Sequence, residues 1–173
     1  MGLKTRLQLS TMMFLQYFIW GTWYVTLNTY LGETLGFTAT QIGLCYGTFA
    51  IACMISPFFV GLIADKFFAT EMVLGFMHIL GAVLLMVASR ATTFQFFYPA
   101  LLLYTPTYAP TMALTNSLSF HQMDNPGKQF PGVRVLGTIG WIVANNVVGW
   151  LGFTSSVEQL YLGAAVSLML GMY

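Results

Sequence analysis

Four residues between Phe130 and Gly152 carry the side chains best suited to bind a solute. They recur at spacings of four, three and four residues, which would place them on one face of a helix. Along that face they are Arg134, Thr138, Trp141 and Asn145. A guanidinium and an amide form directional hydrogen bonds, a hydroxyl donates or accepts, and an indole stacks on planar groups. Because such a face is costly against lipid, we expect it to line a solute-binding cavity within a membrane protein.

Arg134 also allows a simpler interpretation. It lies only a few residues after Pro131, and a helix that began there would let the guanidinium extend to the lipid headgroups. The polar side chains one to three turns further along favour a binding site instead. The same segment contains small residues that would let a neighbouring backbone come close. These residues are Gly137, Gly140 and Gly149.

The composition indicates that these residues lie in a membrane. Of the 173 residues, 57% are hydrophobic and only 6% are charged, whereas a soluble domain carries about 25% charged residues. So few charges cannot cover a surface that faces water. The apolar residues form long runs, not short alternating segments, so the class we expect is an all-α integral membrane protein. The net charge of +1 and the lack of a basic patch give no indication of a nucleic-acid partner.

Six hydrophobic segments can be placed along the chain, and each predicts a transmembrane helix. They cover residues 7–31, 41–64, 71–88, 94–120, 131–152 and 158–173. The last segment is still apolar at Tyr173, so we expect the chain to be a piece of a longer protein. Basic residues in the short loops favour the N-terminal side over the other by four to one, which predicts a cytoplasmic N-terminus.

Polar side chains on two further segments are weaker candidates for the same cavity. Gln16 and Trp20 mark one side of the first segment, while Tyr108 and Asn116 belong to the fourth, which two prolines would bend. An interhelical hydrogen bond is the alternative role for Gln16. For His78, in the third segment, we expect a hydrogen bond to a neighbour rather than a proton-carrying role.

The stretch Gly61-Leu-Ile-Ala-Asp65-Lys66 resembles part of a loop motif of the major facilitator superfamily. The resemblance implies a cytoplasmic latch formed by Gly61, Asp65 and Lys66, which takes part in conformational change. Phe68 and Thr70 stand where the motif usually has a glycine and a basic residue, and this departure weakens the latch inference. The alternative for Asp65 and Lys66 is an ordinary solvated pair of little energetic weight.

Other short matches occur in order and at compatible spacing along the whole chain. They are Phe14-Leu-Gln-Tyr17, Trp20-Gly-Thr-Trp23, His78, Tyr108-Ala-Pro-Thr111, Phe130-Pro131, Arg134, Gly137-Thr-Ile-Gly140 and Gln159-Leu-Tyr161. Together they resemble the nucleoside:proton symporter family of that superfamily. The resemblance implies six transmembrane helices that form the N-terminal half of a transporter in the bacterial inner membrane. It also implies that Arg134, Thr138 and Trp141 belong to the nucleoside pocket.

For a proton-driven carrier, the acidic residues are informative by their positions. All five lie in predicted loops or at segment ends: Glu33, Asp65, Glu71, Asp124 and Glu158. Proton coupling usually needs an ionisable group within the membrane, so we expect the coupling carboxylate in the missing C-terminal half. The implied mechanism is alternating access, in which two halves rock about a central site and this chain supplies one wall.

Two other functions stay open at this point. The same fold could carry another small polar solute such as a sugar, or the helices could form a membrane sensor or scaffold that transports nothing. The sequence contains no nucleophile–base set, metal-ligand cluster or phosphate-binding loop. We therefore expect neither an enzyme nor a cofactor, and the partners expected are a nucleoside, protons, the lipid bilayer and the missing half.

Overall fold

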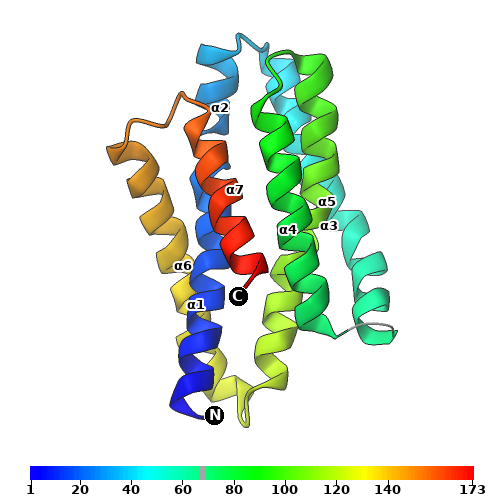
Figure 1. Cartoon of the computed structure of the whole chain (residues 1–173), viewed down its shortest axis with the longest axis vertical. Coiled ribbons are helices and arrows are strands. Elements are labelled where there is room, and N and C mark those ends of the chain that lie inside the picture. Colours follow the sequence, from blue (N-terminus) through cyan, green and yellow to red (C-terminus); the bar gives the residue numbers. More distant parts are fainter. Residues whose placement is uncertain (67–68) are drawn as a thin grey trace.

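The structure, a computed structural model, describes residues 1–66 and 69–173, and for residues 57–66 it describes the helical backbone only. The described part forms six long helices, two short ones and no strand (Figure 1). The long helices are α1 (Leu3–Trp23), α3 (Ala39–Lys66), α4 (Thr70–Ser89), α5 (Phe94–His121), α6 (Pro126–Trp150) and α7 (Glu158–Gly171). A short helix α2 (Leu27–Thr29) and a π-helix η1 (Tyr30–Thr34) follow α1. The all-α class expected from the sequence is confirmed.

Two helix boundaries differ from those expected. The first segment is not one helix, because α1 ends at Trp23 and a turn separates it from α2. The fifth long helix, α6, begins at Pro126 and not near residue 131. Asn125 caps it by accepting a hydrogen bond from the backbone N–H of Lys128 (3.3 Å), and proline is favourable in the first turn. Arg134 therefore lies about 12 Å inside the helix, two turns from its start.

The helices pack as two groups joined at the centre (Figure 1). In one group α1 packs against α6 and α7, and in the other α5 packs against α3 and α4. Contacts between α4 and α7 and between α1 and α5 join the groups. These contacts are symmetric between the first three long helices and the last three. If α1, α3 and α4 are replaced by α5, α6 and α7 in that order, and the reverse, the same kinds of contact result. Such symmetry is typical of two structural repeats of three helices.

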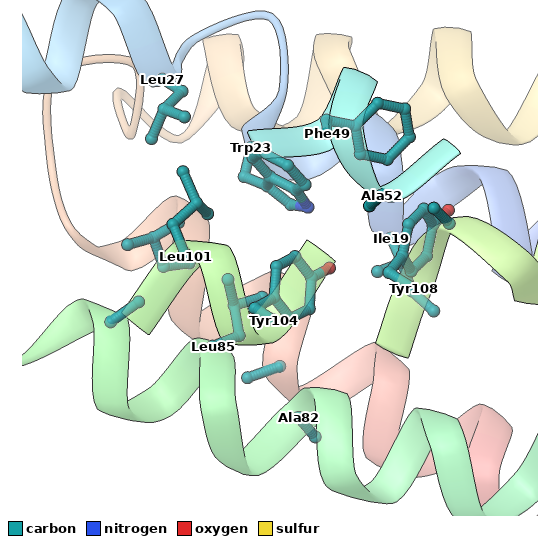
Figure 2. Close-up of a cluster of buried hydrophobic side chains, with 14 of the residues drawn as sticks. Ile19, Trp23, Leu27, Phe49, Ala52, Ala82, Leu85, Leu101, Tyr104 and Tyr108 are labelled. Carbon is teal, nitrogen blue, oxygen red and sulfur yellow. The ribbon is translucent and has the colours of Figure 1, made fainter. Parts of the chain in front are cut away.

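Large side chains fill the centre of the bundle, as Figure 2 shows. The Trp23 ring meets the Tyr104 ring edge-on at 5.5 Å, and Leu85 and Leu101 close the space beside them. In a bilayer, such packing stabilises mainly through van der Waals contact, because lipid tails are as apolar as leucine. Many other large apolar side chains point outward, among them Phe76, Phe96, Leu103 and Trp150.

Two helices in the described part are long and apolar enough to cross a membrane by length and composition: Ala39–Ser56 within α3, and α4. The remaining long helices carry more polar side chains, and several of these are turned toward other helices. In α5, for example, the buried polar residues include Thr105, Thr107, Thr111 and Thr115. Polar residues that are satisfied within the protein lower the average hydropathy of a helix without exposing it to water.

Candidate solute-binding site

The position of the candidate site is set by the close contact between α1 and α6. The α6 face turned to α1 consists of small or branched apolar residues, and Gly140 approaches so closely that a Cβ there would overlap the carbonyl oxygen of Phe14. Gly137 is buried in the same contact. Gly149 has nothing within 4 Å of where its Cβ would be, so of the three glycines expected to pack it alone takes no part.

The four polar residues predicted on α6 lie beside this contact and not within it. Arg134, Trp141 and Asn145 are half-buried, while Thr138 is exposed and the described helices do not cover it. The amide of Asn145 donates to the carbonyl oxygen of Trp141 at 2.9 Å, a local bond within the helix. The glycines occupy the packed face because only small residues fit there, and this leaves the polar row along its edge.

Arg134 lies against α1 and does not extend from the start of its helix. Its guanidinium carbon is 4.1 Å from the centre of the Tyr17 ring, a cation–π distance. Within the described residues it has no salt-bridge partner and makes no side-chain hydrogen bond. A guanidinium has five N–H donors, so this group can still bind the oxygen or nitrogen acceptors of a solute.

Five aromatic residues form a continuous cluster beside Arg134, which we call the aromatic wall. Its centre is Trp20, whose ring meets the Trp141 ring edge-on at 4.5 Å and stacks on Phe49 at 5.3 Å. Tyr24 lies 5.1 Å from Trp20 on one side, and Tyr17 lies 6.4 Å away on the other. The buried Nε1 of Trp20 has no hydrogen-bond partner in the described structure. Two sequence candidates, Trp20 and Trp141, are therefore brought together here with Arg134.

Asn116 on α5 lies at the level of Arg134 in the membrane. The rings of Phe120 and Phe130 meet at 4.5 Å where α5 ends and α6 begins. Because the two helices run in opposite directions, Asn116 and Arg134 each lie one turn further into the bundle from that contact. The buried Oδ1 of Asn116 lacks a partner in the described structure. An unpaired acceptor and a set of unpaired donors thus occur at the same depth.

Gln16 and Tyr108 belong to a separate buried network behind the aromatic wall. The Gln16 side chain donates to the Thr111 hydroxyl (2.8 Å) and its Oε1 lies 2.8 Å from Nε2 of His78. The Tyr108 hydroxyl donates to the Gln16 carbonyl oxygen at 2.5 Å. Nδ1 of His78 lies 3.1 Å from the Ser167 hydroxyl. Gln16 is fully buried and Tyr108 nearly so, which puts both in interhelical hydrogen bonds and away from any surface open to a solute.

The sequence interpretation missed Tyr17 as a neighbour of Arg134. Tyr17, Trp20 and Tyr24 are spaced by three and four residues, so one face of α1 carries all three rings. That spacing was available in the sequence, but Trp20 was the only aromatic residue considered as a site candidate on that segment. Trp23, three residues after Trp20, packs in the core instead (Figure 2).

Two further expectations concern other parts of the chain. The latch residues Gly61, Asp65 and Lys66 fall among those whose side chains are outside the described residues, so the latch stays a prediction. Within the described residues, no three His, Cys, Asp or Glu side chains come together in a way that could hold a metal ion.

Comparison with known proteins places this architecture in a family. The family model described as "Nucleoside H+ symporter" matches residues 3–173. In Escherichia coli (strain K12), YegT is 40% identical over 178 residues, nucleoside permease NupG 37% over 175 and the xanthosine permease 38% over 171. These matches cover 99%, 99% and 96% of this chain but only 42%, 42% and 41% of the relatives. The chain thus spans about two fifths of their length.

A solved structure shows the same arrangement of helices. The crystal structure of the nucleoside transporter NupG, as a D323A mutant, matches with a TM-score of 0.95 and 36% sequence identity. The match covers 97% of this chain and 43% of that one. The resemblance inferred from the short sequence matches is thereby confirmed: the chain belongs to the nucleoside H+ symporter family, whose members are multi-pass membrane transporters and not enzymes.

Proposed function

We propose that this chain forms the N-terminal half of a carrier that imports nucleosides together with protons. The relatives NupG and the xanthosine permease carry names that specify nucleoside transport. The observation that carries the proposal for this chain is the placement of Arg134 against the Tyr17 ring of the aromatic wall. This wall also contains Trp20 and Trp141. A cation with no salt-bridge or hydrogen-bond partner among the described residues is costly in a membrane, and an aromatic wall next to it suits a planar solute with polar edges.

Each part of a nucleoside has a matching group in this arrangement. The base can stack on the half-buried Trp141 ring, an interaction worth about 1–3 kcal/mol per base in other aromatic sites. The Arg134 guanidinium donates to a base carbonyl or to a ribose oxygen. The hydroxyl of Thr138, which no described helix covers, can donate to or accept from the ribose. Asn116 supplies an acceptor at the same depth.

The second half of the carrier would close the site and provide proton coupling. Four of the acidic residues, Glu33, Glu71, Asp124 and Glu158, are exposed at helix ends or in loops of this chain. Carboxylates at helix ends and in loops are poorly placed to carry a proton through the membrane. We assign proton coupling and closure of the site to the missing C-terminal half, with alternating access between two six-helix halves as the mechanism.

The proposed orientation has the N-terminus in the cytoplasm of the bacterial cell, with the chain in the inner membrane. Lys4, Arg6 and Lys128 belong to the end of the bundle where α1 and α6 begin, and Arg90 belongs to the opposite end. Single cysteines introduced at Thr92 and at Gln122, after replacement of Cys45 and Cys53, test this directly. A membrane-impermeant thiol reagent added to intact cells should label position 92 and not position 122.

Uptake of radiolabelled uridine by cells that express the complete transporter tests the transport proposal. We expect saturable uptake that depends on the proton gradient and falls strongly in Arg134→Gln. Arg90→Gln is the matched control, because Arg90 is exposed at the opposite end of the bundle. Sugar uptake in place of nucleoside uptake would show a carrier for another solute. A wild-type protein that carries neither would overturn the proposal and favour a sensor or scaffold.

A further inference from the structure

The guanidinium of Arg134 rests on one particular ring of α1. It lies 4.1 Å from the centre of Tyr17, and within the described residues no carboxylate or hydrogen-bond acceptor holds it. The face of an aromatic ring attracts a cation, and the attraction grows when water is excluded. The Tyr17 ring is thus the contact that fixes where the charge of Arg134 lies relative to the aromatic wall.

Gly137 makes room for this contact one turn further along α6. A Cβ at Gly137 would lie 2.7 Å from Cδ2 of Tyr17 and 2.8 Å from Nη1 of Arg134. Both distances are below those that real Cβ atoms adopt, so even an alanine would push the ring and the guanidinium apart or aside. The side chain of Arg134 therefore lies close to the bare backbone of Gly137, with its guanidinium carbon over the Tyr17 ring.

Tyr17 is itself held firmly in place. Its side chain is only 6% exposed and lies 6.4 Å from the Trp20 ring. The residue before it is Gln16, which the buried network ties to His78 on α4 and Thr111 on α5. The backbone of α1 at Tyr17 is therefore anchored to two other helices, and the ring offers a fixed surface.

We propose that Tyr17 and Gly137 form a seat that positions the Arg134 guanidinium for solute binding. The Tyr17 ring holds the guanidinium by cation–π contact without using any of its N–H groups in a hydrogen bond, which leaves these donors to bind acceptors of the solute. Tyr17 is thus a positioning residue that acts through Arg134. The inference deepens the proposed function and rests on it, because it assigns Arg134 to the solute.

The ring, and not the hydroxyl, is what the seat requires, and this sets the choice of variants. Tyr17→Phe keeps the aromatic face and should keep wild-type uptake. Tyr17→Leu keeps an apolar side chain but removes that face, and we expect the half-saturating uridine concentration to rise roughly 3- to 30-fold. Phe18→Leu is the matched control, since this neighbouring ring contacts Phe14 and not Arg134. The maximal rate per transporter in the membrane should change much less than the half-saturating concentration.

A double-mutant cycle separates positioning from a general packing defect. If Tyr17 acts through Arg134, Tyr17→Leu should have almost no further effect on the half-saturating concentration in an Arg134→Gln background. Gly137→Ala should resemble Tyr17→Leu, while Gly149→Ala, on the same helix with open space around it, should not change uptake. Equal effects of Tyr17→Leu in both backgrounds would overturn the inference even when Arg134→Gln lowers uptake and the proposed function stands.

A stability measurement keeps the inference testable without transport. The same four proteins of the cycle, purified in detergent, are unfolded thermally in the absence of solute. Coupling between Tyr17→Leu and Arg134→Gln in the unfolding midpoint is expected from the cation–π contact, and additive shifts would contradict it. If the wild-type protein does not take up uridine but the unfolding midpoints still show coupling between Tyr17→Leu and Arg134→Gln, the nucleoside proposal is wrong and the contact between Tyr17 and Arg134 is still supported.

Discussion

Replacing Gln16 by leucine should destabilise the bundle from within. The Gln16 side chain joins three helices, because its amide nitrogen donates to Thr111 on α5 and its oxygen meets the His78 ring on α4, each at 2.8 Å. Leucine has a similar size but no polar atom. The change removes both hydrogen bonds and leaves a ring nitrogen of His78 without a partner in a fully buried position.

The size of the effect follows from the number of bonds lost. Interhelical hydrogen bonds within membranes contribute about 0.6 kcal/mol each on average and up to about 1.7 kcal/mol. Two bonds therefore correspond to roughly 1–3 kcal/mol of unfolding free energy, before any added cost of the unpaired ring nitrogen. That is a large share of the stability of a typical domain, about 5–15 kcal/mol.

Unfolding in mixed detergent micelles with increasing denaturing detergent measures this difference. The matched control is Gln95→Leu, because Gln95 is exposed near the start of α5 and makes no side-chain hydrogen bond among the described residues. Equal midpoints for Gln16→Leu and the wild type would refute the reasoning that this network holds α1, α4 and α5 together. A similar loss in both glutamine variants would refute it as well, since the effect would not depend on burial.

Three further results are expected. Gly140→Ala should weaken the α1–α6 contact by about 1–3 kcal/mol in the same assay, while Gly149→Ala should not, because only Gly140 meets a backbone carbonyl of α1. Trp141→Ala should raise the half-saturating nucleoside concentration by roughly 5- to 100-fold, and Trp141→Phe should largely preserve it, since a ring remains for stacking. The amino group of Met1 bonds to Asp124 and holds the pKa of that carboxyl below its ordinary value, so acetylating Met1 should raise this pKa in an NMR titration.

The sign of that last effect follows from the direction of the shift. A carboxyl whose pKa is lowered on folding stabilises the fold above its ordinary pKa and loses that contribution as the pH falls through the lowered value. Asp124 is exposed, so the contribution is small and screened by salt. Asp124→Asn should therefore leave the unfolding midpoint at neutral pH nearly unchanged, and a large shift would contradict this.

Much of the membrane fold could be predicted because a bilayer imposes a strong rule on the chain. Scarcity of charge and long apolar runs are sufficient to indicate spanning helices, since lipid offers no partner for backbone N–H and C=O groups. The helix ends were harder. The start of α6 at Pro126 depends on the Asn125 cap and a proline in the first turn, and a polar loop composition concealed both.

The sequence predicted the roles of some polar residues and not of others. The spacing of Arg134 and Trp141 on one helix was visible in the sequence, and both lie with Trp20 at the candidate site. Gln16 was a weaker candidate for the same cavity, and its partners are His78 and Thr111, which lie 62 and 95 residues away in the chain. Periodicity along one helix contains no information about which side chains of other helices lie opposite.

The amino-acid sequence by itself determined that this protein lies in a lipid bilayer, the family to which it belongs and the helix face that carries its polar side chains. Those properties depend on composition and on spacing within a single helix. The tertiary structure alone decided that glycines take the packed face of α6, that Gln16 is enclosed in a network, and that Tyr17 lies beneath Arg134. Each of these depends on how closely two helices approach, and that distance is set jointly by the side chains of both.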